Sequence, residues 1–306
     1  MDLVPRRRFG RTDLLVPVIP VGTQAFSNVF KEITDDEALE LVQHAVDIGL
    51  SHFDCSMCYG DSMRRLALAL LEEVVHREDL ILTGRVCCHG RDPWLYSAAR
   101  VQATVEAQLE LLGISQFDAM LVHDPQDFEA VMAPGGVLDG LKALKQRGLI
   151  AAMGLGMGPI ENHLRAIEEN RIDCLLFFAE YSLLGWQNAE PLLSAAAAKD
   201  VGVMNGWSIL RGLLTGDEMD RAAARGNATG WTDQIARAKE ILAWCRHRGV
   251  HLLALALQLC LREQRIAANP IAPQTIDEMD MLVWAINQKL PEGVFEEFAG
   301  QFYGDG

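Results

Sequence analysis

Short apolar runs alternate with longer amphipathic segments along most of the chain. The runs are rich in β-branched and aromatic residues, and the segments between them repeat their apolar residues every three or four positions. The runs lie at 19–26, 52–56, 80–86, 118–124, 151–157, 173–181, 202–208 and 265–271. Eight strand–helix units in series predict an α/β fold, the (β/α)8 TIM barrel.

Local signals support this pattern. Residues 7–19 predict a β-hairpin that turns at 10–13 and plugs the barrel ahead of its first strand. A Thr-Asp-Asp-Glu start at 34–37 is typical of a capping box. Helices are predicted at 34–48, 96–112, 137–146 and 231–248. No linker or change in composition divides the chain, so we expect a single domain over 1–306.

The composition of the chain limits the classes of binding partner that we expect. The chain has 306 residues, a formal net charge of -15 and a pI near 4.9, which argues against binding to nucleic acid or an anionic membrane surface. The basic cluster at 6–8 is short, and we expect it to be a solvated part of the hairpin. The start of the chain is polar and no long apolar run follows, so we expect a soluble, cytoplasmic protein. Seven cysteines without framework spacing suggest reduced thiols.

Chemically useful side chains stand where the predicted strands end. Asp54 ends the second strand and Tyr59 follows in its loop; Arg85 lies at the end of the third strand and His123 at the end of the fourth. In a barrel of this kind the active site is built from the carboxyl ends of the strands and the loops that follow them. We therefore expect these four side chains to meet at one mouth of the barrel.

Four sequence stretches resemble the aldo-keto reductase family: GRTDLLVPVIPVGT at 10–23, AVDIGLSHFDCSMCYG at 45–60, LELLGISQFDAMLVHDP at 109–125 and VGVMNGWSILRGLLTG at 201–216. Together with EYSLL at 180–184, they look most similar to the branch of L-galactose, L-fucose and D-threo-aldose dehydrogenases. The resemblance implies a barrel that binds NAD(P)(H) without a Rossmann domain, acts on a sugar-like or small carbonyl or alcohol substrate, and uses a tetrad of Asp, Tyr, Lys and His.

The resemblance also implies roles. Tyr59 would give a proton to the carbonyl oxygen during hydride transfer, or remove it in the dehydrogenase direction, and His123 would orient that oxygen. A phenol needs a nearby cation to act near neutral pH, and Asp54 would hold that cation. Arg85 stands where the family has Lys, and a guanidinium is longer, planar and always charged. Lys31, in the loop after the first strand, is an alternative source of an ammonium group.

The cofactor side departs from the family as well. The resemblance places Thr23 and Asp54 beside the cofactor, Trp207 as a stacking aromatic if the register slips by one residue, and Leu210, Arg211 and Gly212 around a pyrophosphate. Phe177 and Phe178 occupy the region where the family has a carboxamide-binding Gln. Residues 269–279, which include Thr275, contain no Arg or Lys to bind a 2'-phosphate. We therefore expect NAD, with NADP less favoured.

Two alternatives stay open. Cysteines 55, 58, 87 and 88 and histidines 89 and 123 lie near strand ends, as zinc ligands could, but strand alternation turns Cys55 away from Asp54, and we expect no metal. The Arg85 substitution leaves room for a non-redox barrel protein, which would catalyse proton transfer on a carbohydrate-like substrate or only bind its ligand. The sequence specifies neither the substrate nor the oligomeric state.

Overall fold

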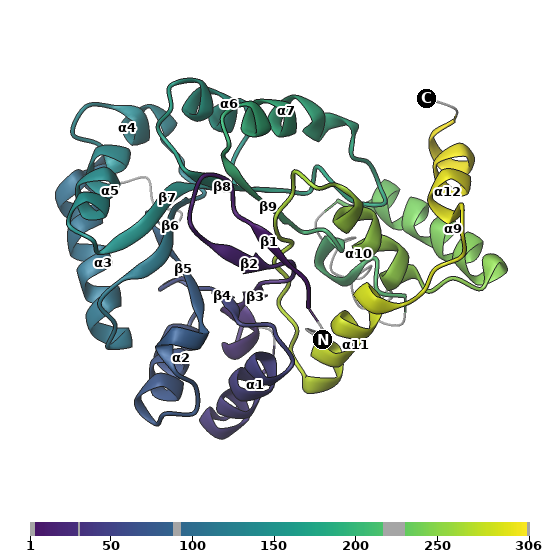
Figure 1. The fold of residues 1–306 in the computed structure, drawn as a ribbon, viewed down its shortest axis with the longest axis horizontal. Coiled ribbons are helices and arrows are strands. Elements are labelled where there is room, and N and C mark those ends of the chain that lie inside the picture. Colours follow the sequence, from purple (N-terminus) through teal and green to yellow (C-terminus); the bar gives the residue numbers. More distant parts are fainter. Residues whose placement is uncertain (1–3, 30, 88–92, 217–229, 305–306) are drawn as a thin grey trace.

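The computed structural model describes residues 4–29, 31–87, 93–216 and 230–304. At its centre seven parallel strands form one sheet in the order β3-β4-β5-β6-β7-β8-β9, and helices surround it (Figure 1). The strands are β3 (Val21–Gly22), β4 (His52–Asp54), β5 (Ile81–Val86), β6 (Phe117–His123), β7 (Ile150–Gly156), β8 (Cys174–Phe178) and β9 (Gly202–Gly206). Each strand pairs with its neighbour along the chain, as strand–helix repeats require.

The eighth predicted run closes the ring without forming a regular strand. On one side the Ala267 amide donates to the Val203 carbonyl of β9 at 2.9 Å. On the other side the Gly22 amide of β3 donates to the Ile271 carbonyl at 2.7 Å. Pro270 lies between these contacts and has no N–H, which explains why the ladder is interrupted. The predicted TIM barrel is confirmed, with this irregular segment in the place of its eighth strand.

The predicted hairpin consists of β1 (Arg6–Arg8) and β2 (Leu15–Pro17), which pair antiparallel. Figure 1 shows it lying over the middle of the ring of strands. Phe9 is fully buried in a cluster with residues of the barrel interior such as Leu121 and Met204. Gly10 has a φ of +56°, and a Cβ there would lie 2.1 Å from the Gly202 nitrogen, so only glycine permits this approach. The hairpin therefore plugs the end of the barrel where the strands begin.

In the basic cluster at 6–8, Arg6 and Arg8 are exposed as expected, but Arg7 is partly buried. The Arg7 guanidinium is partly buried and donates to the Ile266 carbonyl at 2.7 Å, to the Glu263 carbonyl at 3.1 Å and to the Leu261 carbonyl. These carbonyls stand at and after the end of helix α10 (Leu252–Arg262), where orphan acceptors need donors. The arginine is thus used to attach the plug to the wall of the barrel.

The helices follow the predicted periodicity closely. They are α1 (Asp35–Asp47), α2 (Ser62–Leu71), α3 (Ala98–Leu112), α4 (Phe128–Met132), α5 (Val137–Gln146), α6 (Ile160–Glu168), α7 (Glu190–Ala198), α9 (Thr232–Arg248), α10 (Leu252–Arg262), α11 (Ile276–Asn287) and α12 (Val294–Tyr303). Short 3-10 turns lie at η1 (Thr23–Phe26), η2 (Arg77–Asp79), η3 (Pro93–Tyr96), η4 (Gln187–Ala189) and η5 (Leu210–Gly212). The capping box at Thr34 and Glu37 is present. No helix in the described part of the chain is long and apolar enough to cross a membrane.

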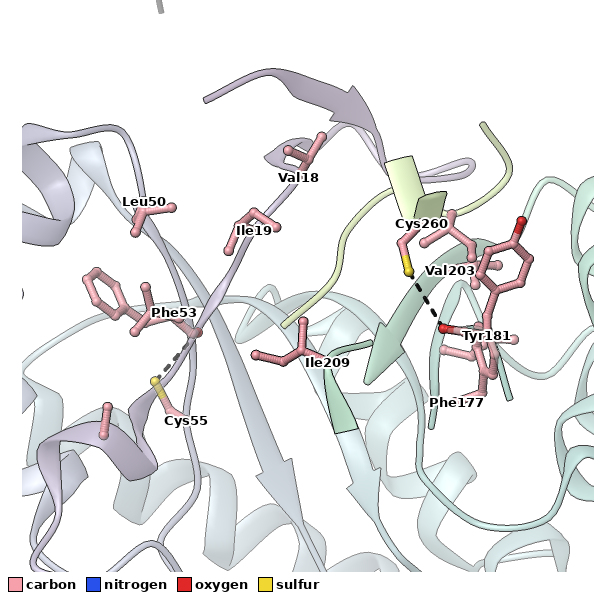
Figure 2. Packing of buried hydrophobic residues seen from close by; sticks show 14 of the residues in the cluster. Val18, Ile19, Leu50, Phe53, Cys55, Phe177, Tyr181, Val203, Ile209 and Cys260 are labelled. Carbon is pink, nitrogen blue, oxygen red and sulfur yellow. Dashed lines mark hydrogen bonds between the residues drawn. The ribbon is translucent and has the colours of Figure 1, made fainter. Parts of the chain in front are cut away.

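Most of the core lies between the sheet and the helices. Figure 2 shows part of it, with Leu50, Phe53 and Cys55 on one side and Tyr181 and Cys260 on the other. The Cys55 thiol donates to the Phe53 carbonyl at 3.6 Å and is fully buried. Cys55 therefore packs in the outer core, as the alternation of side chains along β4 predicts.

Candidate active site

The ends of β4, β5 and β6, three neighbouring strands, supply the candidate site. Asp54 is the last residue of β4, and Arg85 and His123 lie at the ends of β5 and β6. Tyr59 follows β4 in a tight loop in which its own amide donates to the Ser56 carbonyl at 3.1 Å. The strand ends thus bring all four predicted tetrad residues to one sector of the barrel.

Asp54 and Arg85 form a buried ion pair. Arg85 Nη2 donates to Asp54 Oδ2 at 2.6 Å, and the two side chains are only 2% and 8% exposed. A buried pair of this kind compensates its desolvation only with good geometry, so neither partner can be removed cheaply. The Gln108 side chain of α3 donates to the Arg85 carbonyl at 2.9 Å and fixes the end of β5.

Space for the long Arg85 side chain comes from a glycine on β7. A Cβ at Gly156 would lie 2.3 Å from Arg85 Nη1 and 3.3 Å from its Cζ. The guanidinium therefore packs against the bare backbone of β7 while it binds Asp54 on β4. Sequence reasoning identified Arg85 but missed Gly156, because the two are far apart in the sequence.

A neutral histidine lies beneath this ion pair. His52 stands two residues before Asp54 on β4, and its Nε2 lies 2.8 Å from the Thr83 hydroxyl. Burial, together with the Arg85 charge, lowers the pKa of His52 to about 3. The Arg85 guanidinium thus has an uncharged neighbour below it and the Asp54 carboxylate beside it.

Tyr59 and His123 form the second pair. The Tyr59 hydroxyl lies 3.5 Å from His123 Nε2, and the two rings are perpendicular with centroids 5.6 Å apart. His123 is 2% exposed, whereas Tyr59 is half-buried. A phenol and an imidazole at this distance can both form hydrogen bonds with one oxygen atom of a ligand. Lys31 is exposed in its loop, and its charge lowers the pKa of the Glu37 carboxyl only as a minor contribution after bonds to Thr34.

The expected cofactor residues fall into two groups. Thr23 is fully buried, and its hydroxyl donates to the Asp54 carbonyl at 3.1 Å. This hydroxyl therefore helps to fix the end of β4. Thr275 is the N-cap of α11, and its hydroxyl accepts from the Glu278 amide at 3.1 Å. Both threonines thus have structural bonds within the protein.

The other group lies after β9. Trp207, Leu210 and Arg211 all have positive φ angles, of 60°, 48° and 55°, and Gly212 follows at 92°. The Arg211 guanidinium carbon lies 5.3 Å from the centroid of the Trp207 ring. These left-handed residues make a compact turn, in which the Leu210 amide donates to the Trp207 carbonyl at 2.8 Å and the Gly212 amide donates to the Ile209 carbonyl at 3.1 Å.

A buried hydroxyl in this turn was missed by sequence reasoning. Ser208 is fully buried, and its Oγ has no hydrogen-bond partner among the described residues. The Phe178 ring on β8 packs edge to face against the Trp207 ring, with the two ring centroids 5.1 Å apart. A buried hydroxyl without a partner is costly, and it indicates a place where a ligand or water can bond.

The zinc alternative receives no support from the geometry. Among the residues that the structure describes, no group of three or more His, Cys, Asp or Glu side chains is arranged to hold a metal ion. Cys55 points into the outer core, and burial raises the pKa of its thiol. Two of the six candidate ligands, Cys88 and His89, lie outside the described residues.

Comparisons with known proteins identify the family. A model of the Aldo/keto reductase family matches residues 18–300. D-threo-aldose 1-dehydrogenase from Pseudomonas sp is 22% identical, with 94% of this chain and 94% of that protein covered. L-galactose dehydrogenase from Arabidopsis thaliana is 24% identical, with 97% and 92% covered. An aldo-keto reductase from Bacillus halodurans, solved in its holo form, superposes with a TM-score of 0.75 at 18% identity and covers 98% of this chain and 96% of its own.

These matches confirm the resemblance read from the sequence, including the sugar-dehydrogenase branch to which two of the relatives belong. The matched region contains the strands that carry Asp54, Tyr59, Arg85 and His123. The chain therefore belongs to the aldo/keto reductase family, whose members are oxidoreductases that use nicotinamide cofactors.

Proposed function

We propose that this protein is an NAD(H)-dependent oxidoreductase that acts on a sugar-like or small carbonyl or alcohol substrate. The observation that carries the proposal is the distance of 3.5 Å between the Tyr59 hydroxyl and His123 Nε2, beside the buried Asp54–Arg85 pair. Proton transfer to an oxygen that gains negative charge needs a positioned acid with a polar partner next to it.

The chain's own residues divide the work. A bound nicotinamide cofactor supplies or accepts the hydride. Tyr59 donates its proton to the substrate oxygen in reduction and takes the hydroxyl proton in oxidation, while His123 holds that oxygen by a hydrogen bond. Arg85 provides a permanent positive charge near the mouth of the barrel, and Asp54 fixes its position.

The turn after β9 fits a nicotinamide cofactor. The buried Ser208 hydroxyl lacks a partner among the described residues and can bond to an acceptor on the cofactor. The amides of Leu210 and Gly212 donate to carbonyls within the turn, so the exposed Arg211 side chain is what offers a pyrophosphate a positive charge there. Trp207 and Phe178 add aromatic surface beside it.

The start of α11 favours NAD over NADP. The Glu278 carboxylate accepts from the Gln274 amide at 2.6 Å, and Glu278's own amide donates to the Thr275 hydroxyl. The Glu278 carboxylate thus already accepts the backbone N–H of Gln274 at this helix start, and that N–H is not available to a 2'-phosphate. Asp277 adds a second negative charge in the first turn.

Two arginines upstream could have reversed this preference, but both are engaged elsewhere. Arg262 pairs with Glu296 at 3.0 Å. Arg265 pairs with Glu263 at 2.7 Å and with Glu190 at 2.8 Å. Reaching a phosphate would require these ion pairs to break.

Calorimetric titration of the purified protein with NADH and NADPH tests the proposal. We expect tighter binding of NADH, and turnover of aldoses or generic aldehydes that is lost in Tyr59→Phe. Tighter binding of NADPH would contradict the cofactor assignment. No binding of either cofactor at millimolar concentration would favour the non-redox alternative instead.

A further inference from the structure

A thiol and a hydroxyl from the loop after β4 lie beside Nδ1 of His123, the ring nitrogen that does not face Tyr59. Cys58 Sγ lies 3.5 Å from His123 Nδ1, and Ser56 Oγ lies 3.5 Å from the same nitrogen. Ser56 Oγ and Cys58 Sγ are 3.0 Å apart. Both residues belong to the stretch between Asp54 and Tyr59, yet neither has a role in the proton transfer proposed above.

Cys58 differs from the other cysteines that the structure describes. Cysteines 55, 87, 174, 245 and 260 are buried, whereas Cys58 is exposed. Burial raises the pKa of the Cys260 thiol to about 12, which keeps that group inert. Cys58 therefore combines access to solvent with contact to the imidazole of the candidate site.

The two ring nitrogens of His123 face different partners. A neutral imidazole carries its proton on one nitrogen and accepts a hydrogen bond on the other, and the partner of one nitrogen fixes the role of the other. Thiol and hydroxyl groups can donate to Nδ1 without being charged. The nitrogen that faces Tyr59 is Nε2.

We propose that Cys58, supported by Ser56, is a positioning residue that donates to His123 Nδ1 and so keeps the ring proton on Nε2, where it points toward Tyr59. The consequence for catalysis rests on the proposed function, because an Nε2–H can hold a substrate oxygen whereas a bare Nε2 cannot. The hydrogen bond itself does not depend on any activity.

The hydrogen bond is tested by the rate at which iodoacetamide alkylates Cys58, measured by mass spectrometry of the peptide that contains it. In this reaction sulfur forms a bond to carbon, iodide leaves, and the thiol proton passes to Nδ1 and then to water. An adjacent base activates a thiol. We expect alkylation about tenfold slower in His123→Leu than in the unmodified protein, and His123→Gln gives a second comparison if the leucine variant is unstable.

His163→Leu is the matched control, because that buried histidine lies on α6 and should leave the rate at Cys58 unchanged. Equal alkylation rates in the unmodified protein and in both His123 variants would overturn the proposal. This arm needs neither cofactor nor substrate, so it decides the question even if the protein has no redox activity.

Turnover provides the second arm. The double variant Ser56→Ala with Cys58→Ala removes both groups at Nδ1, and we expect kcat to fall about fivefold, the effect of one modest hydrogen bond. The KM for NADH should not change. The single variant Cys58→Ser should keep most of the rate, because a hydroxyl also donates a hydrogen bond. An unchanged kcat in the double variant would overturn the positioning role, whereas no turnover by the unmodified protein would refute only the proposed function.

Discussion

Gly156→Ala is the most direct test of how the barrel accommodates an arginine at position 85. The new Cβ would lie 2.3 Å from Arg85 Nη1 and 3.2 Å from the Val122 carbonyl oxygen. Unbonded heavy atoms prefer about 3.5 Å, so the guanidinium must move by about 1 Å. Since Arg85 Nη2 binds Asp54 at 2.6 Å inside the barrel, this movement disturbs a buried ion pair.

The cost can be bounded from two known effects. Forcing an extra methyl group into a packed interior costs about 1–3 kcal/mol. Losing a partner of a buried ion pair costs about 3–5 kcal/mol, and a displaced pair should lose part of that amount. We expect Gly156→Ala to lower the free energy of unfolding by about 2 kcal/mol and to reduce any turnover, because Arg85 no longer lies beside Asp54 as before.

A double-mutant cycle with Arg85→Lys separates this cause from a general effect of alanine in β7. A lysine lacks the planar fork that meets Gly156, so Gly156→Ala should cost much less in the Arg85→Lys background. Urea denaturation of the four proteins measures the coupling, for which we expect about 2 kcal/mol. Gly206→Ala, at the end of β9, is a control that should cost the same in both backgrounds. A coupling near zero would refute the packing of Arg85 on Gly156.

Three further outcomes are expected. Tyr59→Phe should lower the turnover number by at least about a hundredfold in stopped-flow or steady-state assays while leaving NADH affinity unchanged, and an unchanged rate would exclude the phenol from proton transfer. Glu278→Gln removes a negative charge at the start of α11, so calorimetry should show the affinity for NADPH rising about twofold to fivefold relative to NADH; no relative gain would argue against the charge argument. His163 is fully buried, and burial lowers its pKa from 6.5 to about 4. The unfolded chain therefore takes up the proton first, so stability is complete above about pH 6.5 and falls by about 3 kcal/mol toward pH 4. His163→Leu should remove this part of the loss in urea titrations at several pH values, whereas His76→Gln, at an exposed position, should not; identical pH profiles of His163→Leu and the unmodified protein would contradict it.

Local sequence patterns were sufficient for most of the fold. Helix α5 begins and ends where its apolar periodicity does, and the capping box at Thr34 marks the start of α1. The first and last barrel strands were harder to predict. The run at 19–26 looks like one strand, but after Val21–Gly22 the chain turns into a 3-10 helix. The run at 265–271 contains Pro270, and only its contacts with both neighbours show how it closes the barrel.

The candidate site likewise contains features that local sequence patterns predict and features that they do not. Positions at strand ends can be read from the sequence, because the barrel brings all strand ends to one face. The partners of those residues could not be read, because they depend on side-chain packing across strands. Ser56 and Cys58 were visible in the stretch between Asp54 and Tyr59, but nothing in the sequence indicates that both lie 3.5 Å from His123 Nδ1. The Ser208 hydroxyl is equally inconspicuous until its burial is known.

Arg85 and Gly156 show how a site residue at one strand end depends on packing against another strand. The Arg85 guanidinium is long and planar, and it lies inside a barrel that has little spare volume. The barrel accommodates it because β7 presents a glycine where any side chain would collide with Nη1. In this arrangement Arg85 also binds Asp54, so the negative charge of that carboxylate is balanced inside the barrel. Arg85 should therefore be tolerated only together with a glycine at 156, and replacing Gly156 should be much more harmful while Arg85 is present than in the Arg85→Lys background.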